Sequence, residues 1–170
     1  FGTDKSRIYY SSAGSPPWVQ QVTGANINVY SIWLNSPNPL TGFASGDSIS
    51  KTTNSGTNWQ LMPSIGTGPI TGVTGINSTT NYWYTRSNTN IYFSNAGSPF
   101  VIQYTAPAGN FNHLASARNG FIGGPGVIYA VRTNGGISRL NFFVEGVIII
   151  SNEIPASYKL HQNYPNPFND

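Results

Sequence analysis

The sequence predicts an all-β fold of consecutive small antiparallel sheets, because it repeats itself and shows no helical periodicity of useful length. The aromatic residue that ends each unit falls at Trp18, Trp59 and Phe100, each 41 positions after the one before. Two stretches, Ile8–Pro16 and Ile91–Pro99, match closely at an offset of 83 residues, about twice that period. A period near 40 residues with short strands and Gly/Asn turns is typical of β-propeller blades of four antiparallel strands.

Short strands bounded by Gly, Pro or Asn divide the chain into one partial and three complete blades. The predicted domain limits are a repeat region over 1–152, with a partial blade 1–24 and blades 25–66, 67–107 and 108–152, followed by a separate segment over 153–170. Within these limits the predicted strands are 6–22 (the last two strands of the partial blade), 28–34, 41–44, 48–53, 59–62, 70–76, 82–86, 90–95, 100–104, 111–117, 127–132, 136–143 and 147–151.

This blade count falls short of a closed ring. About three and a half blades is fewer than the roughly four to eight that a propeller uses. We therefore expect the chain to be part of a larger propeller. The alternative is a fragment or processed form whose open sheet edges are covered by partner subunits.

The middle unit reads Thr52-x-Asn54-x-Gly56-x-Asn58-Trp59. It resembles the Asp-box (BNR) motif, Ser/Thr-x-Asp/Asn-x-Gly-x-Thr-Trp. The resemblance implies a structural hairpin turn, with an Asn that caps backbone amides, a Gly at positive φ and a Trp that packs between neighbouring sheets. The residues of this turn are Thr52, Asn54, Gly56 and Trp59, and those of two degenerate copies are Gly14, Trp18, Gly97 and Phe100.

Residues 153–170 carry a second pattern, with Ile154-Pro155, Tyr158-Lys159-Leu160 and a run from Gln162 to Asn169. The pattern resembles the opening of the type A C-terminal sorting domain of the type IX secretion system. Its central motif is Tyr164, Pro165, Asn166, Pro167 and Phe168. The resemblance implies export to the outside or outer surface of a Gram-negative bacterium, with the secretion machinery as partner of the complete domain.

Only the start of that sorting domain falls within this sequence, so we expect residues 153–170 to form an extended tail stiffened by prolines. The alternative is a Pro/Asn-rich turn that closes an unrelated β domain.

Composition narrows the function further. Only 8% of the residues are charged, against a usual figure of about 25%, which suits an extracellular surface or one that packs against copies of itself. The net charge of +3 comes from scattered basic residues, so no nucleic-acid partner is predicted. The absence of cysteine excludes disulfides and thiol chemistry. No apolar run reaches the roughly 18 residues of a membrane span.

No catalytic residue, metal or cofactor is predicted. Glycosidases built on Asp-box propellers need paired carboxylates, or an Arg cluster with an activated Tyr. The five acids are not placed to face one substrate: Asp4, Asp47, Glu145, Glu153 and Asp170. The two histidines, His113 and His161, lack metal-ligand spacing.

Four aromatic residues are candidate ligand-facing side chains: Trp33, Tyr82, Trp83 and Tyr84. Successive side chains of a strand alternate between its faces, so Trp83 faces opposite to Tyr82 and Tyr84. An exposed ring could stack on a sugar, as on a cell-surface glycan. The alternative, which the pattern favours, is packing between blades.

Three functions remain. The first is a secreted or cell-surface, non-catalytic β-propeller module with a binding or structural role. The second is a self-associating subunit of an extracellular filament or surface assembly. The third is a fragment of a sialidase-like glycoside hydrolase.

Overall fold

The structure is a computed structural model that describes residues 2–3, 5–11, 14–23, 28–35, 40–96, 98–117 and 126–142. This described part contains strands and no helix, which confirms the predicted all-β fold. Several predictions lie outside the described residues: Gly97, the strand 147–151, and the tail 153–170 with its motif Tyr164, Pro165, Asn166, Pro167 and Phe168.

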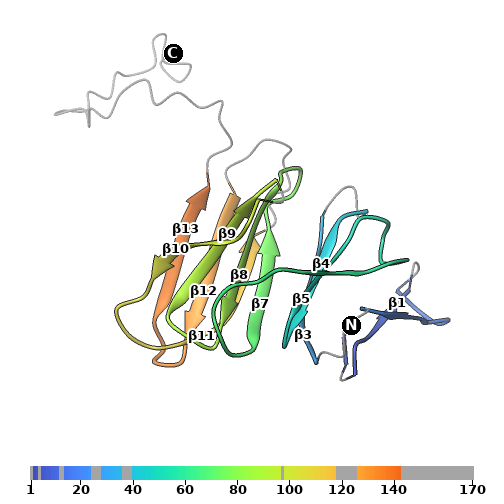
Figure 1. Cartoon of the computed structure of the whole chain (residues 1–170), viewed down its shortest axis with the longest axis horizontal. Helices are drawn as coiled ribbons and strands as arrows, with labels where there is room; N and C mark the ends of the chain where they lie inside the picture. The colour runs from blue at the N-terminus through green and yellow to red at the C-terminus, as the bar shows by residue number, and fades with distance from the viewer. Residues whose placement is uncertain are drawn as a thin grey trace, which may run out of the picture.

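The strands form four antiparallel sheets that follow one another along the chain (Figure 1). The first sheet pairs β1 (Arg7–Tyr10) with β2 (Val19–Val22). The second has the order β3 (Val29–Leu34), β4 (Gly42–Gly46), β5 (Ile49–Thr52) and β6 (Gln60–Met62). The third has the order β7 (Ile70–Gly75), β8 (Asn81–Arg86), β9 (Asn90–Asn95) and β10 (Val101–Thr105). The fourth contains β11 (Phe111–Ala117), β12 (Gly126–Arg132) and β13 (Ile137–Phe142).

Each described strand lies within a few residues of the range that the sequence predicts for it. The largest difference is in β4, which continues to Gly46 instead of ending at Ala44. The β4–β5 turn therefore consists of Asp47 and Ser48 alone, and Gly46 N donates to Ser48 O across it at 2.9 Å. Gly46 fits here because the Asn28 carbonyl oxygen lies where a side chain would begin.

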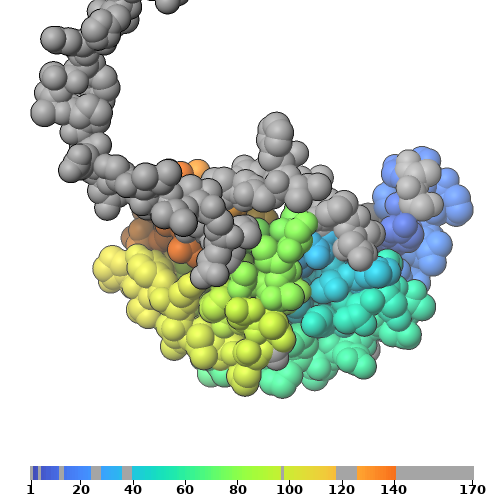
Figure 2. Space-filling view, turned by 90° about the horizontal axis from the view of Figure 1, so that it is seen from above, coloured from blue at the N-terminus to red at the C-terminus, as the bar shows by residue number. Residues whose placement is uncertain are grey.

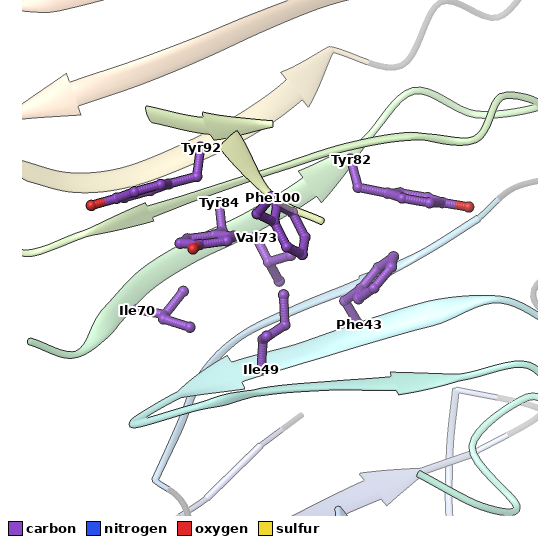
Figure 3. Packing of buried hydrophobic residues seen from close by; sticks show 8 residues of the cluster. All are labelled: Phe43, Ile49, Ile70, Val73, Tyr82, Tyr84, Tyr92 and Phe100. Atoms are coloured by element: carbon purple, nitrogen blue, oxygen red, sulfur yellow. The ribbon is translucent and has the colours of Figure 1, made fainter. Parts of the chain in front are cut away.

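Successive segments of the chain lie side by side in chain order (Figure 2). Each hydrophobic core is formed by side chains of two consecutive sheets, which therefore pack face to face. The central core joins the second and third sheets and is rich in aromatic rings (Figure 3). Its buried members are Phe43, Ile49, Ile70, Val73, Tyr82, Tyr84, Tyr92 and Phe100. This burial of large side chains between sheets supplies the main driving force for the stack.

The first strands of the second, third and fourth sheets, β3, β7 and β11, lie on the inner side of the stack. There β7 contacts both β3 and β11. Glycine permits this approach, because a Cβ at Gly72 would come within 2.8 Å of the Leu114 backbone nitrogen. Val73 N donates to Ser31 Oγ at 3.3 Å, and Ser116 N donates to Thr74 Oγ1 at 3.2 Å. The three inner strands are therefore held at fixed positions next to one another.

Candidate functional site

The turn between β5 and β6 is closed by two polar side chains. Thr52 Oγ1 accepts hydrogen bonds from Gly56 N at 2.8 Å and Asn54 N at 3.3 Å, and donates to Asn54 Oδ1 at 3.1 Å. Asn54 Oδ1 also accepts from Asn58 N at 2.9 Å. Gly56 has a φ of 85°. Because the polar atoms of Thr52 and Asn54 serve the backbone, this turn has a structural role.

The tryptophan that follows this turn is 8% exposed and packs with Ile8, Val29 and Ala44. Trp59 thus inserts between its own sheet and the preceding one. Its Nε1 atom is buried and has no hydrogen-bond partner among the described residues. A second contact joins the same two sheets, since Gln21 Nε2 donates to Ser55 O at 3.3 Å.

The other two units repeat parts of this geometry. Ser11 Oγ donates to Ser15 O at 2.5 Å, and Ser94 Oγ donates to Ser98 O at 2.6 Å. In all three units a hydroxyl therefore bonds the backbone four residues later, but Thr52 accepts from an amide, whereas Ser11 and Ser94 donate to a carbonyl. Sequence reasoning missed this feature, although a Ser or Thr recurs at Ser11, Thr52 and Ser94, which are 41 and 42 positions apart.

The three repeated aromatic residues have matching positions in the repeat, but their side chains differ in how far they are exposed. Trp18, Trp59 and Phe100 each immediately precede the last strand of their sheet. Phe100 is 5% exposed and packs against the preceding sheet, as Trp59 does. Trp18 is 44% exposed, and Gly14 beside it is exposed at a φ of 70°. In the described part of the chain, no sheet precedes β1 that could cover Trp18.

Tyr82, Trp83 and Tyr84 are all buried between sheets, which is the packing between blades that the sequence pattern favours over a ligand-facing role. Tyr82 packs on Phe43 with ring centroids 4.6 Å apart. Trp83 Nε1 donates to Gln103 Oε1 at 2.6 Å.

Tyr84 also has a structural role. Its hydroxyl donates to Ile65 O at 3.0 Å and accepts from Ile65 N at 2.9 Å. Burial raises the pKa of both the Tyr82 and the Tyr84 phenol, which is the opposite of what an activated nucleophile needs.

A buried arginine that sequence reasoning missed holds the loop between the second and third sheets. Arg86 is 5% exposed, and its Nε donates to Ile65 O at 2.7 Å. Its Nη2 donates to Ser64 Oγ at 2.9 Å, and its Nη1 donates to Gly68 O. These donors are engaged with the loop, so Arg86 is a structural residue and not a substrate-binding cation.

Charged groups that could perform acid–base chemistry are sparse in the described part, which contains a single carboxylate side chain, Asp47. It lies in the β4–β5 turn and accepts from Asn28 N at 3.1 Å and Asn28 Nδ2 at 3.3 Å. The described residues contain no group of three metal-ligating side chains. They also contain no helix long and apolar enough to cross a membrane.

The hollow with the features of a binding site runs along the inner strands β3, β7 and β11. It has a volume of about 500 Å³, and we call it the inner groove. Its lining residues are Tyr30, Ser31, Ile32, Trp33, Leu34, Val73, Thr74, Asn77, His113, Leu114, Ala115 and Ser116. None of these side chains is charged. Of the four candidate ligand-facing aromatics, only Trp33 lines this groove.

Sequence reasoning missed the inner groove because its residues come from three strands about one repeat apart. No local motif marks them. The sequence could have indicated the groove only through strand order, because each of the three strands is the first strand of its predicted blade.

A second hollow of about 370 Å³ lies between the third and fourth sheets. Trp83, Ile91, Ile128 and Leu140 contribute to its apolar lining. Arg132 borders it, but its Nη1 donates to Ala108 O at 2.7 Å. This hollow is part of the inter-sheet packing.

No protein-family model matches the chain, and no curated protein matches it. The similarities found are to solved structures of β-propeller proteins. An ancestral GH74 enzyme superposes with a TM-score of 0.67 at 16% identity, over 85% of this chain and 21% of that one. YCF48 bound to a D1 peptide gives a TM-score of 0.61 at 14% identity, over 82% of this chain and 44% of that one.

A chain of the mitotic checkpoint complex gives a TM-score of 0.59 at 12% identity, over 84% of this chain and 45% of that one. The chain therefore spans less than half the length of each of these three structures. At such low identities the likeness concerns the fold alone, and it agrees with the predicted propeller-like blades.

Proposed function

We propose that the protein is a secreted or cell-surface, non-catalytic β-propeller module that binds a ligand through the inner groove. The observation that carries this proposal is the groove itself, a hollow of about 500 Å³ on three strands that are fixed to one another by hydrogen bonds. Pockets of about 300–1,000 Å³ with a few convergent polar groups are typical ligand sites. The single carboxylate of the described part, Asp47, does not line it, which favours binding without turnover.

Export by type IX secretion rests on the sequence pattern of residues 153–170. The test is expression of the chain with a complete C-terminal sorting domain in a bacterium that has this system. Antibody labelling of intact cells should detect the protein at the surface. Replacing Tyr164, Pro165 and Phe168 together by Ala should abolish the labelling, whereas Pro63→Ala, at an exposed position outside the motif, should not. Equal labelling of all three proteins would contradict the proposal.

A second candidate function, self-association in an extracellular assembly, is favoured by the outer face of the fourth sheet. Tyr129, Val131 and Ile137 are 42%, 41% and 66% exposed there. Val131 pairs with Ile137 across β12 and β13, so their side chains lie on the same face. The corresponding face of the third sheet, with Trp83 and Ile91, is covered by the next sheet. An exposed apolar sheet face of this kind favours contact with another sheet.

A fragment of a glycoside hydrolase remains the third candidate, and the likeness to a GH74 enzyme is a likeness of fold. Incubation of the chain with a panel of glycans, followed by mass spectrometry, tests it. We expect intact glycans. Release of shorter products by the purified chain, and not by a mock purification, would replace the proposal with an enzymatic function.

A further inference from the structure

The lining of the inner groove restricts the chemistry of its ligand. A phosphate or carboxylate ligand calls for Arg or Lys, and a cationic ligand calls for a carboxylate. Among the described residues, the lining supplies neither. It supplies hydroxyl, amide, imidazole and aromatic groups, which suit a neutral ligand that forms many hydrogen bonds and also has apolar surface.

The aromatic part of the groove is Tyr30 and Trp33 on β3. Tyr30 is 53% exposed. The Trp33 ring packs on Phe43, at 6.2 Å between centroids, and meets Tyr82 edge-on at 5.7 Å. It also lies over Gly75, where a Cβ would come within 2.7 Å of Trp33 Cη2. Trp33 is therefore held in place by its neighbours while part of it remains accessible.

The polar part of the groove lies on β7 and β11. His113 is exposed, and its Nδ1 lies 3.3 Å from Thr71 O. A carbonyl oxygen only accepts, so Nδ1 is the donor in this contact and Nε2 is left for a ligand. Thr74 Oγ1 donates to Ser116 Oγ at 3.0 Å, and Asn77 adds an amide at the end of the groove.

An extended peptide that adds as a further strand would need backbone donors on the inner edges of these strands. Two of those donors are already engaged, because Val73 N donates to Ser31 Oγ and Ser116 N donates to Thr74 Oγ1. This engagement disfavours strand addition and leaves side-chain recognition as the mode of binding.

We propose that the inner groove binds a neutral carbohydrate, an inference that rests on the proposed binding function. A sugar ring offers C–H groups to the exposed ring of Tyr30 and to the accessible part of Trp33. Its hydroxyls both donate and accept, which matches His113 Nε2, Asn77 and Ser116, whereas the buried Thr74 holds Ser116 in place. A neutral sugar needs no counter-ion, in agreement with the uncharged lining.

The test is isothermal titration calorimetry of the intact chain with neutral oligosaccharides of hexoses, pentoses and N-acetylhexosamines. At least one should bind, and Tyr30→Ala and His113→Ala should each weaken its affinity about tenfold or more. Tyr104→Ala is the matched control, because Tyr104 is 42% exposed on β10 and outside the groove. It should bind as the parent does.

Three results would overturn the carbohydrate proposal: no neutral oligosaccharide binds at millimolar concentration, only anionic glycans or peptides bind, or the groove variants bind as the parent does. Peptide binding that depends on Tyr30 and His113 would leave the proposed binding module intact and refute its ligand class. Failure of surface export is measured separately on cells and does not alter binding by the purified chain.

Discussion

At the scale of single residues, the insertion of one aromatic ring between consecutive sheets links those sheets. Trp59 is 8% exposed and contacts Ile8 of the first sheet as well as its own sheet. The 41-residue spacing in the sequence predicts that an aromatic residue ends the repeat unit at position 59. It could not predict that Trp18 would be 44% exposed, because exposure depends on what covers the preceding face and not on the residue itself.

Trp59→Ala should lower the free energy of unfolding by about 3–5 kcal/mol, through lost burial and a cavity between two sheets. Asp47→Ala should have an effect of less than about 1 kcal/mol, because Asp47 is exposed and hydrogen bonds only Asn28 among the contacts at its turn. Urea unfolding measures both values. The reverse order of the two effects would refute the assigned role of Trp59.

Tyr82→Phe should reduce the loss of stability at alkaline pH. Burial raises the pKa of Tyr82 above the ordinary phenol value of 10.0. As the pH rises through 10.0, the unfolded chain releases this proton before the folded chain does, so the free energy of unfolding falls with increasing pH. Below that range Tyr82 is protonated in both the folded and the unfolded chain, so its contribution to the free energy of unfolding does not change with pH. Denaturation curves taken across this pH range should show a shallower decline for the variant; parallel declines would contradict the prediction.

At the scale of structural elements, the β5–β6 turn shows which contacts a sequence motif predicts and which it does not. The pattern from Thr52 to Trp59 predicts a turn held by side-chain caps, and the described hydrogen bonds of Thr52 and Asn54 have that form. The pattern did not predict that equivalent hydroxyls at Ser11 and Ser94 act in the two degenerate units. Those units keep only a glycine and an aromatic of the motif, and their hydrogen bonds extend the similarity that the sequence shows.

Thr52→Val should destabilise the protein by about 1–3 kcal/mol, because it leaves the buried Gly56 N without its acceptor. Thr53→Val is the matched control, since it makes the same change at an exposed position one residue later. It should change stability by less than about 0.5 kcal/mol. Thermal denaturation of the two variants provides the comparison, and equal effects would show that the turn hydroxyl has no special role.

The strand limits were the most predictable part of the fold, because Gly, Pro or Asn lies at an end of most strands, as Gly42 does for β4 and Pro69 for β7. The inner groove was not predictable. It depends on the approach of β7 to β11, which Gly72 permits, and on side chains such as Tyr30 and His113 that lie on different strands. No pattern within a single strand carries that information.

At the scale of the whole molecule, the stack leaves an apolar face exposed on the fourth sheet, with Tyr129, Val131 and Ile137. The 18.3 kDa chain should therefore associate with itself at high concentration. Multi-angle light scattering should give a mass above that of one chain. The double substitution Val131→Lys with Ile137→Lys should shift the mass toward the monomer, and a stable, soluble monomer of the unmodified chain would contradict the prediction.

A crystal structure grown with the tightest-binding neutral oligosaccharide tests whether the inner groove is the binding site of a non-catalytic module. We expect an intact sugar in the groove, with a ring against Tyr30 or Trp33 and a hydroxyl within hydrogen-bond distance of His113 Nε2. A sugar bound at another surface with the groove empty, or a cleaved sugar in the groove, would contradict it.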